Sequence, residues 1–223
     1  MTVKLFLSAI VKFALGVLLV GALLFLPAGT FAYSGGWLLM GILFIPMFAA
    51  GLVMMVKNPS LLAARLNAKE TQREQNVVVK LSGLMFIVGF AVAGLGVRYD
   101  WYILPPLVSW IAAAVFLLGY VMYAEVLREN TYLSRTIEVQ EGQRVIDTGL
   151  YGVIRHPMYS ATLLLFLAMP LVMGSLYALL VFLVYPVLIA FRIRHEETFL
   201  EQELEGYREY KQRVRYRLIP FVW

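Results

Sequence analysis

Long apolar stretches alternate with short polar ones along this chain, and six apolar segments stand out. Residues 13–56 contain no Asp, Glu, Lys or Arg. A helix needs about 20 residues, within a range of about 17–25, to cross a bilayer core. The six apolar segments are residues 13–26, 36–56, 81–97, 102–124, 159–173 and 176–191. The pattern predicts an all-α polytopic membrane protein of about six transmembrane helices. Gly174-Ser175 would join the last two, which are short, into a helical hairpin, and whether they fully span is left open.

Composition supports this fold class. The 223 residues are 61% hydrophobic and 15% charged, against about 25% charged residues in an average soluble domain. A soluble fold of this size cannot bury so much unbroken apolar sequence. The chain has no cysteine, which excludes disulfides, thiolate metal sites and a thiol nucleophile.

The distribution of Lys and Arg predicts the orientation. Of the 19 basic residues, all but Arg98 fall on the side shared by both termini. The positive-inside rule places that side in the cytoplasm. We therefore expect an integral protein of the cytoplasmic (inner) membrane with both termini cytoplasmic, and basic loops that contact membrane lipid rather than nucleic acid. No cleavage site clearly ends the first apolar segment, so it should stay as an anchor. Further cytoplasmic helices should lie at the interface, one of them through Arg65.

The chain shows no internal repeat and no second domain. We expect one membrane domain over residues 1–223. Within it, residues 1–126 would form a four-helix scaffold, and residues 127–223 would form a cofactor-binding hairpin and cytoplasmic tail.

Two polar clusters flank the uncharged run from 157 to 191, and a helical hairpin would bring them to the same side of the membrane. Arg155-His156 at a helix start gives a donor-rich pocket suited to a carboxylate or phosphate. Glu196 and Glu197 follow the run, and carboxylates at interface depth are costly unless paired or functional. They suit an ammonium or ribose hydroxyls. The simpler alternatives are an anchoring Arg155 and a surface ion pair between Arg192 and Glu196.

No metal site is predicted. His156, His195 and Glu196 would supply two imidazoles and one carboxylate, but the usual further His spacings are missing. The chain also lacks a Rossmann glycine motif after a strand, a Walker loop and a nucleophile elbow.

The last 90 or so residues resemble the isoprenylcysteine carboxyl methyltransferase family, which is related to the phospholipid methyltransferases. The matching pieces, in chain order, are Asp147-Thr148-Gly149-Leu150-Tyr151, Arg155-His156-Pro157-Met158-Tyr159, Glu196-Glu197-Thr198-Phe199-Leu200, Tyr207, Tyr210-Lys211-Gln212-Arg213-Val214 and Ile219-Pro220. The chain departs from the family pattern at Leu150, often proline, at Ala161, often glycine, and at Gly206, where the tail glycine is displaced.

The resemblance implies that S-adenosylmethionine binds between the hairpin and the tail, and that a lipid-like or amphipathic acceptor enters from the bilayer. The candidate cofactor-binding residues are Tyr151, Arg155, His156, Pro157, Tyr159, Glu196 and Glu197. The candidate catalytic residues are Arg213 and Arg155. Arg213 would orient a carboxylate acceptor through two hydrogen bonds. A carboxylate is favoured because it needs no base, whereas an amine would need one, such as Glu196, Glu197 or His195.

Two other functions stay open. A membrane NADPH-dependent reductase of the sterol-reductase type has a similar Arg-His-Pro hairpin. A non-enzymatic membrane module or transporter is disfavoured, because no apolar segment carries a charge at its midplane. The sequence leaves the oligomeric state open.

Overall fold

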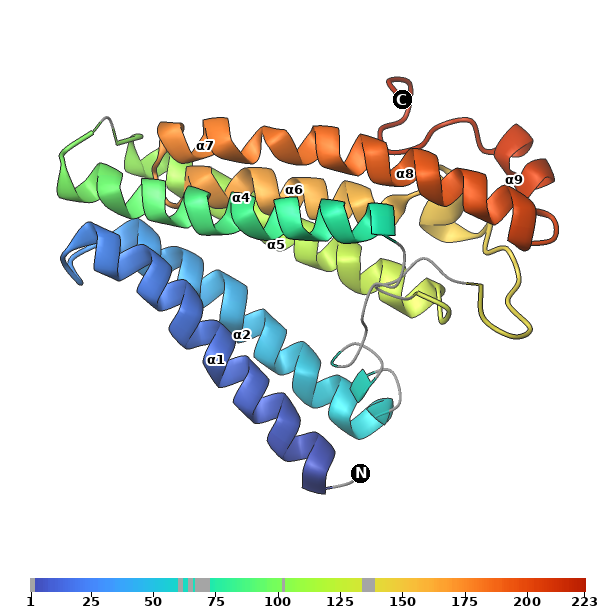
Figure 1. The fold of residues 1–223 in the computed structure, drawn as a ribbon, viewed down its shortest axis with the longest axis horizontal. Coiled ribbons are helices and arrows are strands. Elements are labelled where there is room, and N and C mark those ends of the chain that lie inside the picture. The colour runs from blue at the N-terminus through green and yellow to red at the C-terminus, as the bar shows by residue number, and fades with distance from the viewer. Residues whose placement is uncertain (1–2, 60–61, 64–65, 67–72, 102, 134–138) are drawn as a thin grey trace.

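The computed structural model describes residues 3–59, 62–63, 66, 73–101, 103–133 and 139–223, and its described elements are helical. The predicted surface helix through Arg65 lies outside the described residues. Figure 1 shows the helices in chain order. They are α1 (Val3–Ala28), α2 (Ser34–Lys57), α4 (Arg73–Arg98), α5 (Pro106–Glu129), the 3-10 helix η1 (Gly149–Gly152), α6 (Pro157–Val172), α7 (Leu176–Phe182), α8 (Val184–Glu203) and α9 (Tyr207–Arg213).

Five helical stretches of the described chain are long and apolar enough to cross a membrane: α1, α2, α4, α5 and the combined α7–α8. The sixth apolar helix, α6, has 16 residues and is shorter than the usual 17–25. Many large apolar side chains of these helices are exposed, as on a surface that lipid covers. The predicted fold class, an all-α polytopic membrane protein, is confirmed.

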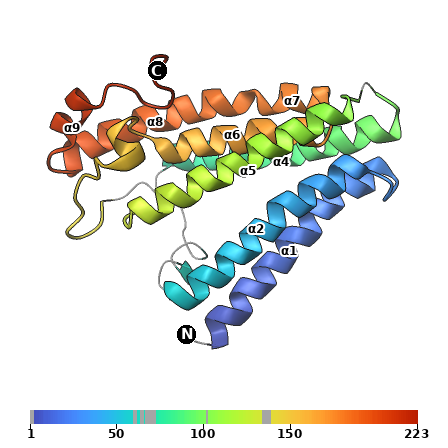
Figure 2. The ribbon, with the colours of Figure 1, turned by 180° about the vertical axis from the view of Figure 1, so that it is seen from behind.

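Helices α4, α5, α6 and α7–α8 pack as one bundle, and the α1–α2 hairpin leaves it at an angle (Figures 1 and 2). The hairpin contacts the bundle near the end at which α1 is joined to α2. There the Tyr33 hydroxyl donates to the carbonyl of Met173 over 2.9 Å. A Cβ on Gly94 of α4 would overlap the carbonyl oxygen of Leu24 in α1, so glycine permits close contact between these helices.

The turn between α6 and α7 closes the predicted C-terminal hairpin. Gly174 has a φ of +74°, a left-handed conformation that glycine adopts at little cost. The Ser175 side chain then accepts a hydrogen bond from the backbone N–H of Ala178 and caps α7. Three short turns, residues 29–33, 99–101 with 103–105, and 173–175, lie at one end of the molecule (Figure 1). Residues 139–156 and 204–223 lie at the other.

The helix that contains the last apolar segment extends beyond the end of that segment at residue 191. Helix α8 continues through the charged residues to Glu203. The sequence from 192 to 203 contains no Gly or Pro and is rich in residues with good helix propensity. One rigid helix therefore runs from the apolar bundle into the polar end, and it carries Glu196 and Glu197 with it.

Candidate cofactor site

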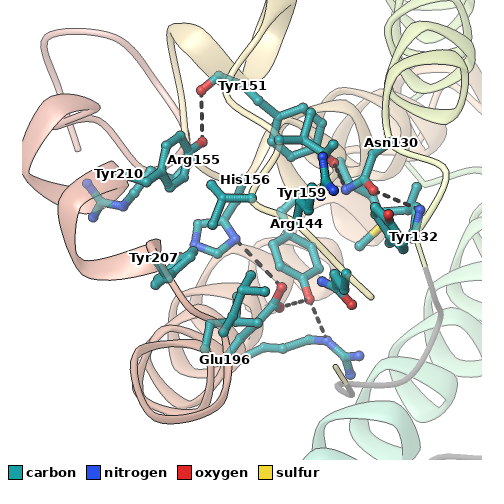
Figure 3. Close-up of a pocket in the computed structure, with 18 residues that line it drawn as sticks. Asn130, Tyr132, Arg144, Tyr151, Arg155, His156, Tyr159, Glu196, Tyr207 and Tyr210 are labelled. Atoms are coloured by element: carbon teal, nitrogen blue, oxygen red, sulfur yellow. Dashed lines mark hydrogen bonds and ion pairs between the residues drawn. The ribbon is translucent and has the colours of Figure 1, made fainter. Parts of the chain in front are cut away.

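A pocket opens at the polar end of the bundle, where α6 begins and where α8 and α9 meet the loop after α5 (Figure 3). It encloses about 840 Å³ of empty space, a value that includes its part open to solvent. Aromatic, basic and acidic side chains share the wall with several aliphatic ones. The lining residues are Asn130, Tyr132, Leu133, Gln143, Arg144, Val145, Ile146, Tyr151, Arg155, His156, Met158, Tyr159, Arg192, Glu196, Leu200, Leu204, Tyr207 and Tyr210.

The C-terminal segment pairs with the chain just before α6. Ile154 and Tyr216 form a parallel bridge, and the backbone N–H groups of Arg155 and His156 donate to the carbonyls of Tyr216 and Arg217, each over 2.9 Å. The Ser160 hydroxyl adds a 2.6 Å bond to the carbonyl of Leu218. These contacts hold the tail against the start of α6, where Pro157 occupies the first helical turn.

Glu197 joins this tail to the bundle. Its side chain is 3% exposed, and its Oε1 accepts from Arg155 Nε over 2.7 Å and lies 3.2 Å from His156 Nε2. Its Oε2 accepts from Arg217 Nε over 3.0 Å and lies 3.6 Å from Lys211 Nζ. A buried carboxylate is tolerated only when such partners compensate its lost hydration.

Arg155, the partner of Glu197, also binds the C-terminal segment directly. Its Nη1 donates to the carbonyls of Val214 over 2.6 Å and Arg215 over 2.8 Å. One guanidinium thus ties together the start of α6, helix α8 and the C-terminal segment. We name this group of Arg155, His156, Glu197 and Arg217 the tail junction.

Glu196 faces the pocket instead. Its Oε2 accepts from the Tyr159 hydroxyl over 2.5 Å. Its Oε1 lies 3.9 Å from His156 Nδ1. The His156 ring stacks on Tyr159 with 5.7 Å between ring centroids, so an imidazole, a phenol and a carboxylate form one continuous part of the wall (Figure 3).

Tyrosines form the opposite part of the wall. The Tyr210 hydroxyl donates to the backbone carbonyl of Tyr151 over 2.8 Å, and Asn130 Nδ2 donates to the Tyr151 hydroxyl over 2.9 Å. Burial raises the pKa of Tyr151 to about 12, although the hydrogen bond from Asn130 lowers it. Burial also raises the pKa of Tyr210. These phenols therefore stay protonated at physiological pH.

Tyr207 differs from the other tyrosines. Its hydroxyl is buried and has no hydrogen-bond partner within the part of the chain that the structure describes. Burial raises the pKa of Tyr207 well above its usual value, and the nearby charges of Glu197 and Glu196 raise it further. A buried hydroxyl without a hydrogen-bond partner is destabilising. It marks a place where a polar atom of a ligand would supply the missing hydrogen bond.

The predicted site residues fall into three groups. Tyr151, Arg155, His156, Tyr159 and Glu196 line the pocket. Pro157, which is fully buried, and Glu197, which lies in the tail junction, do not line the pocket. Arg213 is exposed at the end of α9, is paired with Asp147 and does not line the pocket.

Several residues of the site were not among the predicted ones: Asn130, Arg192, Tyr207, Tyr210 and Arg217. Tyr207 and Tyr210 had a usable signal, since they are three residues apart and share one face of the short helix α9. Arg217 had no such signal in the sequence. It contacts Glu197 because the tail pairs with residues 154–156.

The second histidine lies apart from the pocket. The His195 ring packs on Phe191, with 4.5 Å between ring centroids, and it is not part of the pocket wall. The described residues contain no group of three or more His, Cys, Asp or Glu side chains that could hold a metal ion.

Comparison with known proteins agrees with the resemblance predicted from the sequence. Residues 107–206 match the family model described as phospholipid methyltransferase. The chain is also similar to the mouse (Mus musculus) Delta(14)-sterol reductase TM7SF2, with 34% identity over 91 residues. That alignment covers 40% of this chain and 22% of the mouse protein. The family match includes every lining residue of the pocket except Tyr207 and Tyr210. The predicted resemblance to these membrane methyltransferases is thereby confirmed for residues 107–206.

Proposed function

We propose that this protein transfers a methyl group from S-adenosylmethionine to a lipid-like or amphipathic acceptor at the cytoplasmic face of the membrane. The observation that carries the proposal is the position of the pocket. It lies at the polar end of an apolar bundle, and all its lining residues except Tyr207 and Tyr210 belong to the segment that matches phospholipid methyltransferases. An acceptor held in the bilayer can present its polar end there while its apolar part stays in lipid.

The side chains of the pocket suit this cofactor. The carboxylate of Glu196 is an acceptor for an ammonium or for ribose hydroxyls. The rings of Tyr151, Tyr159 and Tyr210 offer surfaces for adenine. His156 and Arg144 can donate hydrogen bonds to the carboxylate of the cofactor. The Tyr207 hydroxyl, which has no partner among the described residues, can form a further hydrogen bond with the ligand.

S-adenosylmethionine would supply a methyl group already activated by the positive sulfur that carries it. The protein then needs mainly to orient the two reactants and to exclude water. The tail junction serves this purpose, because it fixes the C-terminal segment and α9 beside the pocket. The predicted preference for a carboxylate over an amine acceptor depended on the fact that a carboxylate needs no base and on a role for Arg213 in orienting it. That residue pairs with Asp147 outside the pocket wall, so the preference and the role of Arg213 stay predictions.

S-adenosylhomocysteine, the product form of the cofactor, should raise the melting temperature of the detergent-purified protein. A ligand that binds only the folded state stabilises it by about 2.7 kcal/mol at 100 times its dissociation constant. Thermal unfolding with and without millimolar ligand measures this shift, and calorimetric titration gives the affinity.

The same titration with NADPH tests the second candidate, a membrane reductase. The 34% identity to a sterol reductase favours this alternative over any other enzyme class. Stabilisation by NADPH and none by S-adenosylhomocysteine would replace the methyltransferase proposal with the reductase.

The cytoplasmic location of the pocket rests on the charge distribution and has its own test. Because the chain has no cysteine, single cysteines can be introduced without removing others. We expect Ser34→Cys, at the exposed start of α2, to react with an impermeant thiol reagent added to intact cells. Gln202→Cys, exposed near the pocket end of α8, should react only after the membrane is opened. The reverse labelling pattern would place the pocket on the outer face.

A further inference from the structure

Three side chains in the pocket wall form a line of hydrogen bonds. Arg192 Nε of α8 donates to the Tyr159 hydroxyl over 2.8 Å, and that hydroxyl donates to Glu196 Oε2 over 2.5 Å. Arg192 and Tyr159 are 8% and 5% exposed, whereas the Glu196 side chain is 20% exposed. The Glu196 carboxylate, which faces the pocket, is therefore held by a hydrogen-bonded pair, Tyr159 and Arg192, that is almost completely buried.

The chemistry of these groups fixes the direction of the line. A guanidinium can only donate, and a phenol has one proton. Because Arg192 supplies the proton of the first hydrogen bond, the single proton of Tyr159 is available for Glu196. The carboxylate must accept it, which occupies Oε2. Oε1 remains on the side of His156 and the pocket, 3.9 Å from Nδ1 of that ring.

We propose that Arg192 and Tyr159 are positioning residues: they act through Glu196 and direct its Oε1 to the cationic amino group of the bound ligand. This inference rests on the proposed function, in which that group is the ammonium of S-adenosylmethionine. It gives Tyr159 a second role, beyond the aromatic surface, and it gives Arg192 a role other than that of a surface ion-pair partner of Glu196.

The test compares two ligands on each variant: S-adenosylhomocysteine and an analogue of it that lacks the α-amino group. Tyr159→Phe keeps the ring and removes the hydroxyl. We expect it to weaken binding of S-adenosylhomocysteine roughly tenfold, the size of one lost hydrogen bond to a charged group. Binding of the deaminated analogue should change less than about twofold, because that ligand lacks the group that Glu196 binds. Calorimetry measures both affinities without any turnover.

Matched variants separate positioning from general damage. Tyr185→Phe also removes a buried phenol hydroxyl, which donates to Thr162 Oγ1 over 2.8 Å, but Tyr185 does not line the pocket. It should affect the two ligands equally. Glu196→Gln should reproduce the selective loss seen in Tyr159→Phe. Arg192→Gln should do so as well, since an amide can donate or accept and no longer fixes the direction of the Tyr159 proton.

Melting curves of each free variant show whether it folds, and Arg192→Gln provides the test if Tyr159→Phe does not. Equal weakening of both ligands by Tyr159→Phe, or no weakening of either, would overturn the positioning role. Failure of the wild-type protein to bind S-adenosylhomocysteine at all would instead refute the proposed function on which this inference rests.

Discussion

Replacement of Glu197 by alanine should destabilise the folded protein by about 3–5 kcal/mol, the cost of breaking a buried ion pair by removing one partner. Arg155, with a side chain 4% exposed, would lose its only carboxylate partner within the described chain and keep its buried charge. Arg217 and His156 would lose the same acceptor. Equilibrium unfolding in detergent, followed by circular dichroism, measures the change.

Glu201→Ala is the control for this variant. Glu201 is on the same helix, and it pairs with Lys211 where both side chains are about one-third exposed. Exposed pairs contribute about 0–1 kcal/mol, so Glu201→Ala should stay close to wild type. If Glu197→Ala were no less stable than Glu201→Ala, the tail junction would not hold the fold together.

Arg155→Ala should have a comparable effect, and it should also release the C-terminal segment. The carbonyls of Val214 and Arg215 would lose their buried donor, and an unsatisfied buried acceptor costs about 1–3 kcal/mol. Glu197 would lose its shortest ion pair. Hydrogen exchange measured by mass spectrometry should therefore speed up in residues 214–218 more than in α4, which supplies no residue of the junction.

The double variant Arg155→Ala/Glu197→Ala tests whether the two residues act as one unit. Because each single change leaves the other charge without its partner, the two losses should not add. The double variant should be more stable than the sum of the single effects predicts, by about 0.5–3 kcal/mol. Additive losses would show that each residue stabilises the fold independently.

Hydropathy and charge were enough to predict the membrane fold. Each of the six apolar segments falls mainly on helix, although α5 begins only at Pro106 and α6 ends at Val172, and the turn at Gly174-Ser175 forms where the sequence placed it. The return of charge at Arg192 marks the end of apolar sequence but not the end of the helix, which continues to Glu203. Charge position predicts where a chain leaves lipid, whereas helix ends depend on breakers and caps.

The roles of neighbouring glutamates could not be read from the sequence. Successive residues on a helix point in directions about 100° apart, so the rotation of α8 decides which carboxylate faces the pocket. In the structure Glu196 lines the pocket and Glu197 lies in the tail junction. The rotation follows from packing against α6 and from pairing of residues 154–156 with the tail, and neither leaves a local sequence signal.

The angle at which the first hairpin leaves the bundle has a consequence for sequence divergence. Every described residue that lines the pocket lies between Asn130 and Tyr210, so α1 and α2 supply none of it. Close contacts with the bundle, such as those at Gly94 and Met173, constrain the hairpin near the short turns. Over the rest of their length these two helices can change by mutation without rebuilding the pocket, so in related proteins they are free to adapt to different membranes and different lipids.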